Sequence, residues 1–147
     1  MSKTIRREIQ IPQPQEQVWQ ALTNSATLAE WMYPNDIEPR VGHHFTFRAP
    51  PNPKVGFDGM VVRCKVLECE PPSRLVFSWS ADGVGDTRVS FRLEPDSEGT
   101  RVLFEHAGFD SSQGWSDQAI HGAEFGWAKM LKQLPAVVAG LAGCKDR

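Results

Sequence analysis

The sequence predicts an α+β domain in which a long C-terminal helix lies along an antiparallel sheet. Three observations lead to this prediction. The segment 115–141 places apolar residues at helical spacing, the region 43–107 consists mainly of segments in which apolar and polar residues alternate, and two short helical segments follow one N-terminal strand. A helix with one apolar stripe and a sheet with one apolar face must cover each other, so we expect the helices on one side of the sheet.

The N-terminal part of the chain predicts one strand and two short helices. Thr4–Ile11 alternates isoleucine with charged or polar residues, which is typical of a half-buried strand. Pro14 suits the first turn of a helix, which is predicted over Gln15–Thr23. Ser25 is expected to cap a second short helix that ends before Pro34.

The middle of the chain predicts a meander of antiparallel strands. Turns that contain proline or glycine separate the alternating segments, and such short turns join antiparallel neighbours with one buried face. The expected strands are His43–Arg48, Phe57–Glu70, Leu75–Ser80, Thr87–Glu94 and Arg101–His106.

The last helix is predicted over Trp115–Leu141. At 100° per residue its apolar residues fall within an arc of about 120°, and they are Ile120, Ala123, Trp127, Met130, Leu131, Leu134, Val138 and Leu141. At about 1.5 Å per residue the helix would run roughly 40 Å. Pro135 lacks a backbone donor, and because the apolar spacing continues past it, we expect a kink rather than an end.

Length and composition bound the class of protein. A chain of 147 residues is expected to form one domain, residues 1–147. A net charge of −2 with mixed signs gives no basic surface for nucleic acid, and the sequence shows neither a membrane span nor a secretory signal. Three cysteines without CxxC spacing favour a reduced, cytoplasmic protein. Cys64 and Cys69 are five residues apart on one predicted strand, hence expected on opposite faces.

The common catalytic and metal-binding motifs are missing from the sequence. His43 and His44 are adjacent on a predicted strand and should point to opposite faces, and the sequence contains no HxH, CxxC or HExxH spacing, so we expect no metal site. A glycine-rich phosphate loop and a GxSxG elbow are also missing. We therefore expect no cofactor and assign no catalytic residue.

Several short stretches, taken in order, carry a resemblance to a known family. They are Pro14-x-x-x-Val18-Trp19, Leu28-x-x-Trp31, Gly42-x-x-Phe45-x-Phe47, Val66-Leu67-Glu68-x-x-Pro71-Pro72-x-Arg74-Leu75-Val76-Phe77-x-Trp79, Thr100-Arg101-Val102-x-Phe104-x-His106-x-Gly108-Phe109, and Trp127 in the last helix. The sequence resembles the Aha1 C-terminal-like group, the homologues of the activator of Hsp90 ATPase, within the START/Bet v 1-like (SRPBCC) helix-grip superfamily. The resemblance implies a curved antiparallel sheet wrapped around a long C-terminal α-helix, with two short helices after the first strand.

The resemblance also implies a cavity for a hydrophobic ligand between the sheet and the last helix. In that fold the inward faces would line the cavity with apolar side chains and a few polar groups. The predicted lining residues are Trp31, Phe45, Phe47, Met60, Val62, Phe77, Trp79, Phe91, Phe104, His106, Glu124, Trp127 and Leu131. The alternative is that these side chains fill the interior and leave no cavity.

Three titratable residues have alternative roles. His106 faces inward on an apolar strand face, where it would bind the polar end of a ligand or shuttle a proton. Alternatively it bonds the backbone near Gly108 and anchors the entry to the last helix. Glu124 would face His106 or a cavity mouth, or lie on a solvated flank of the helix. Glu68 would accept from loop amides or contact a ligand.

Three functions of different class fit the sequence. The first is binding of a small hydrophobic or amphipathic molecule without catalysis, by a monomer or homodimer. The second, implied by the resemblance, is a protein-interaction module that regulates an Hsp90-type chaperone ATPase. The third is a cyclase- or hydrolase-like enzyme that uses the same cavity, which requires convergent acid and base groups. Only His106 with Glu124 or Glu68 could supply these groups, so the sequence favours a binding protein over an enzyme.

Overall fold

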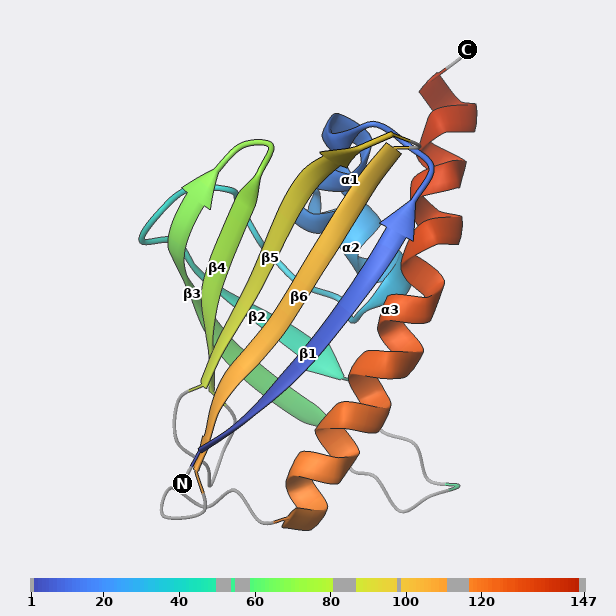
Figure 1. The fold of residues 1–147 in the computed structure, drawn as a ribbon. Coiled ribbons are helices and arrows are strands. Elements are labelled where there is room, and N and C mark those ends of the chain that lie inside the picture. Colours follow the sequence, from blue (N-terminus) through green and yellow to red (C-terminus); the bar gives the residue numbers. More distant parts are fainter. Residues whose placement is uncertain are drawn as a thin grey trace.

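The computed structural model describes residues 2–49, 54, 59–80, 87–97, 99–110 and 117–145. Over these residues the order of elements is one strand, two short helices, five strands and one long helix (Figure 1). They are β1 Ser2–Ile11, α1 Gln15–Thr23, α2 Ser25–Trp31, β2 His44–Ala49, β3 Met60–Glu70, β4 Arg74–Ser80, β5 Thr87–Asp96, β6 Gly99–Asp110 and α3 Asp117–Lys145. The predicted α+β class is confirmed.

The strands of the described residues form one curved antiparallel sheet in the order β1-β6-β5-β4-β3-β2. β2 to β6 follow one another as the predicted meander, and β1 pairs with β6, so the first strand of the sequence lies at one edge. The long helix α3 crosses one face of the sheet, and α1 and α2 lie on that same side, where both contact α3 (Figure 1).

Alternation along the strands gives the sheet two chemically different faces. Strand β5 shows this most regularly, because each residue buried toward α3 is followed by one that is more exposed on the opposite face. Its buried residues are Thr87, Val89, Phe91 and Leu93. Arg88 and Arg92 are exposed on the outer face. The inner face is therefore apolar and the outer face carries charge.

Helix α3 buries the stripe that the sequence predicts. Its buried side chains are Ile120, Trp127, Leu131, Leu134 and Val138. The helix starts at Asp117, so the predicted start at Trp115 lies outside the described residues, and it runs without interruption past Pro135. Phe125 lies on the opposite side and is 75% exposed. None of the described helices combines the length and apolar character that a membrane span needs.

The prediction that Ser25 caps α2 is wrong. Asn24 occupies the N-cap, and its Oδ1 accepts a hydrogen bond from the backbone N–H of Thr27 at 3.1 Å. Ser25 is already helical, and its Oγ donates to the carbonyl oxygen of Asn35 at 2.6 Å. Asparagine is as good a cap as serine, so the sequence pattern allowed both positions.

The prediction that Cys64 and Cys69 lie on opposite faces is also wrong. Cys64 is opposite Trp79 on β4, and the register shifts between Val66 and Glu68, after which Cys69 is opposite Leu75. Directly paired residues of an antiparallel sheet share a face, and an irregularity that adds one residue reverses the alternation. Both thiols are free, and burial raises the pKa of Cys64, which keeps it protonated.

Candidate functional site

The predicted lining residues meet between the sheet and α3. Eleven of them are buried, namely Trp31, Phe45, Phe47, Val62, Phe77, Trp79, Phe91, Phe104, His106, Trp127 and Leu131. Met60 begins β3, and its side chain lies outside the described residues. Glu124 is half-buried at the flank of α3. Helix and sheet are thus brought together as predicted.

Aromatic rings contact one another between α3 and the sheet. The ring of Trp127 lies 4.4 Å from that of Phe104 and 5.4 Å from that of Trp79, measured between centroids. Trp79 in turn lies 5.6 Å from Phe47, which lies 5.5 Å from Phe45. Tilted and edge-to-face contacts of this kind stabilise beyond the area that they bury. These rings therefore pack against one another between α3 and the sheet.

A chain of hydrogen bonds runs through this aromatic layer. The indole Nε1 of Trp127 lies 2.9 Å from Nδ1 of His106, whose Nε2 lies 2.6 Å from Oγ1 of Thr87. Thr87 Oγ1 also donates to the carbonyl oxygen of Trp79 at 3.0 Å. An indole nitrogen can only donate, so Nδ1 of His106 accepts and carries no proton. In the neutral ring Nε2 then carries the proton and donates to Thr87.

The surroundings keep His106 neutral. Only 1% of its surface is exposed, and burial lowers its pKa to about 3. The imidazole is therefore uncharged at neutral pH, and both ring nitrogens have partners within the protein. The predicted bond to the backbone near Gly108 is wrong. His106 is joined to the last helix through the side chain of Trp127.

Glu124 and Glu68 have partners of their own. The Oε2 atom of Glu124 lies 3.9 Å from Nη2 of Arg7, so this ion pair joins α3 to the edge strand β1. Nη1 of Arg7 also donates to the carbonyl oxygen of Arg6 at 2.7 Å. Glu68 accepts from Nη2 of Arg74 at 3.4 Å on the outer face. These contacts do not bring an acid and a base together at His106.

Of the two adjacent histidines, His43 belongs to a loop network and His44 begins β2. The Nε2 atom of His43 lies 2.9 Å from the carbonyl oxygen of Asp36, and its Nδ1 atom lies 3.4 Å from Nη2 of Arg40. Among the described residues, no three or more histidine, cysteine, aspartate or glutamate side chains gather in a way that could hold a metal ion.

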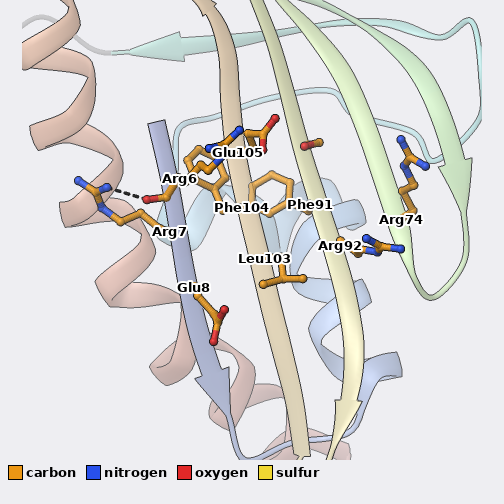
Figure 2. A pocket seen from close by; sticks show the side chains of 10 residues that line it. Arg6, Arg7, Glu8, Arg74, Phe91, Arg92, Leu103, Phe104 and Glu105 are labelled. Carbon is orange, nitrogen blue, oxygen red and sulfur yellow. Dashed lines mark hydrogen bonds and ion pairs between the residues drawn. The ribbon is translucent and has the colours of Figure 1, made fainter. Parts of the chain in front are cut away.

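The outer face of the sheet holds a hollow that the sequence reasoning missed. It has a volume of about 580 Å³ and crosses β1, β6, β5 and β4, with arginines around it (Figure 2). A second hollow of about 460 Å³ lies on the same face, where Ser78, Arg88 and Ala107 line it. The alternation predicted over Thr87–Glu94 places Arg92 on the polar face, whereas Arg74 precedes the predicted strand Leu75–Ser80. Only the register between β4 and β5 shows that Arg74 and Arg92 lie directly opposite each other.

Comparison with known proteins identifies the family. The model of the family described as activator of Hsp90 ATPase homolog 1-like protein matches residues 12–139. The chain belongs to this family. Its fold is that of the START/Bet v 1-like helix-grip superfamily, as the resemblance implied.

Solved structures agree with the family assignment. The chain is 32% identical to protein MLL2253 from Mesorhizobium loti, with a TM-score of 0.80 over 93% of this chain and 97% of that one. It is 27% identical to protein BH1534 from Bacillus halodurans, with a TM-score of 0.73 over 92% of this chain and 96% of that one. CalU16 from Micromonospora echinospora is 28% identical, with a TM-score of 0.69 over 93% and 75%. No curated protein sequence matches this chain.

The lowered pKa of His106 predicts a pH-dependent stability. Between pH 6.5 and about 3 the unfolded chain binds a proton at His106 that the folded chain does not bind. The free energy of unfolding should therefore fall as the pH decreases through this window, with a slope of at most about 1.4 kcal/mol per pH unit from this group. Urea unfolding of the wild type and of His106→Asn, measured from pH 7 to pH 4, isolates the effect. If the free energies of unfolding of the wild type and His106→Asn differed by the same amount at every pH, the predicted effect of His106 would be contradicted.

Replacement of Thr87 tests the hydrogen-bonded chain. Thr87→Val keeps the shape but leaves the buried Nε2–H of His106 and the carbonyl of Trp79 without their partner, so we expect a loss of about 1–3 kcal/mol in the free energy of unfolding. Thr87→Ser keeps the hydroxyl and is the matched control. Chemical denaturation measures both, and equal stability of the two variants would show that the hydroxyl contributes nothing.

Proposed function

We propose that this protein binds a small hydrophobic or amphipathic molecule between the sheet and α3, without catalysing a reaction on it. The observation that carries the proposal is the layer of aromatic rings that separates α3 from the sheet around one buried polar chain. Apolar burial has no strong directionality, so ring surfaces of a ligand can replace contacts that these rings make with each other. The polar chain supplies an acceptor for a single donor of the ligand.

A ligand that enters between α3 and the sheet would displace contacts of these rings, which we propose α3 allows by moving at its edge. Along β1 the helix is held by the ion pair of Arg7 and Glu124, whose side chains are 41% and 27% exposed. An ion pair this exposed contributes at most about 1 kcal/mol, so it opens at little cost. In the interior the bond from Trp127 to His106 must break, and we propose that a hydroxyl or amine of the ligand then donates to His106 Nδ1 in place of the indole.

The indole N–H signals of the tryptophans test ligand binding. We expect a fatty acid, a sterol or a planar aromatic polyketide to shift or broaden the Nε1–H signal of Trp127 in ¹H–¹⁵N spectra, because the ligand displaces its bond to His106. The signal of Trp19 on α1 serves as the control within the same molecule. Trp127→Phe assigns the signal, and native mass spectrometry of each mixture detects the complex. Unshifted signals together with the absence of any complex would contradict the proposal.

The family description favours a second candidate, regulation of a chaperone ATPase. The description of the matching family refers to an activator of Hsp90 ATPase, which supports an interaction with an Hsp90-type chaperone. If this holds, the protein should raise the ATP turnover of a bacterial Hsp90 in a saturable manner. An unchanged turnover at excess protein would remove this candidate and leave ligand binding untouched.

We also propose a cytoplasmic location. Cys64 and Cys69 are free thiols, and a reduced state of this kind is the default in the cytoplasm.

A further inference from the structure

The larger hollow on the outer face is a consequence of side-chain size. It covers two adjacent rows of outward residues that run across the strands from β1 to β4. In one row Ser90 lies between Val76 of β4 and Glu105 of β6, and in the next Arg92 lies beside Leu103 of β6. Short side chains at the centre and long charged side chains around them leave a depression with a partly apolar floor (Figure 2).

Charge is distributed unevenly along this hollow. At the β1 end Arg6 Nε lies 3.0 Å from Oε2 of Glu105, and Glu8 lies 3.8 Å from Arg101, so cations and carboxylates alternate there. At the β4 end Arg74 and Arg92 are directly opposite each other in the strand register. Figure 2 shows both side chains on the same side of the hollow. Like charges in directly opposite positions destabilise a sheet.

The acidic neighbours compensate this arginine pair only in part. Glu68 contacts Nη2 of Arg74 at 3.4 Å, and Glu94 contacts Nε of Arg92 at 3.7 Å. Each contact uses one nitrogen of a guanidinium that carries five N–H donors. All four side chains are between 39% and 68% exposed, so water weakens both ion pairs. The lining includes four arginines and two glutamates, in a protein with a net charge of −2.

We propose that Arg74 and Arg92, with the hydroxyl of Ser90, form a binding site for the oxyanion group of a small ligand. Each guanidinium can donate two parallel N–H bonds to an oxyanion, the bidentate geometry in which arginine binds carboxylates and phosphates strongly, and two such groups would bind the same oxyanion. The apolar part of the ligand would lie over Leu103. The site is on the face of the sheet opposite to α3, so it is independent of the ligand proposed for the interior.

Titration with inorganic phosphate and with succinate tests this site and distinguishes the two sources of an oxyanion. The measurement is the shift of the arginine Nε–H signals at low ionic strength, where exposed charges are least screened. We expect saturable shifts for Arg74 and Arg92 with one or both anions, and a weakening of about tenfold or more in Arg92→Gln and in Arg74→Gln. Arg48→Gln removes an exposed arginine from β2 at the far edge of the sheet and is the matched control, for which we expect unchanged binding.

Thermal unfolding provides a second readout that does not depend on assigned signals. Without anion, Arg92→Gln should be at least as stable as the wild type, because it removes a like-charge pair. Phosphate or succinate should then raise the Tm of the wild type and of Arg48→Gln but not that of Arg92→Gln. Shifts that do not saturate, or an equal loss of binding in Arg48→Gln, would show a diffuse charge effect and overturn the proposal. A loss of stability in Arg92→Gln without anion would overturn the argument from like charges.

Discussion

The hydrogen-bonded chain from Trp127 through His106 and Thr87 to the carbonyl of Trp79 is the constraint on which the rest of this structure depends. It joins α3 to three neighbouring strands through the centre of the apolar layer. Buried polar groups cost free energy unless each finds a partner, so the chain has to form as a unit. Its donors run in one direction, which fixes both the tautomer of His106 and the orientation of the Trp127 ring.

Because the indole is fixed in this way, the aromatic layer has one arrangement. Trp127 contacts the rings of Phe91 and Phe104 while its nitrogen donates to His106. A ligand under α3 must therefore displace a directional bond as well as apolar contacts. The proposed ligand would therefore need one donor as well as a large apolar surface, since a purely apolar ligand would leave Nδ1 of His106 without a partner.

The same alternation that builds this interior also builds the outer face. Every inward residue of β5 is followed by an outward one, so Phe91 beneath α3 is flanked by Ser90 and Arg92 on the other side. The sheet thus presents an apolar surface to the helix and a charged, hollowed surface to solvent. The two proposed sites share strands but no side-chain chemistry, and each can be tested without the other.

Much of this arrangement was predictable from the sequence. The alternation of the strands and the helical spacing around Trp127 and Leu131 predicted which faces meet, because those periods follow from backbone geometry alone. The partners of His106 were not predictable, since Thr87 and Trp127 approach it only through the register and the side-chain rotamers. The irregularity after Val66 reversed the face of Cys69, and no sequence pattern marked it. The pairing of Arg74 with Arg92 also depended on register.

The protonation state of His106 tests the central claim most directly. Long-range ¹H–¹⁵N correlation of the imidazole distinguishes the two neutral tautomers and the charged ring. The hydrogen-bonded chain predicts a neutral ring with the proton on Nε2, unchanged from pH 7 down to about pH 4, since the pKa of His106 is lowered to about 3. A proton on Nδ1, or a charged ring near pH 6, would contradict the donation from Trp127 and with it the account of how α3 is held.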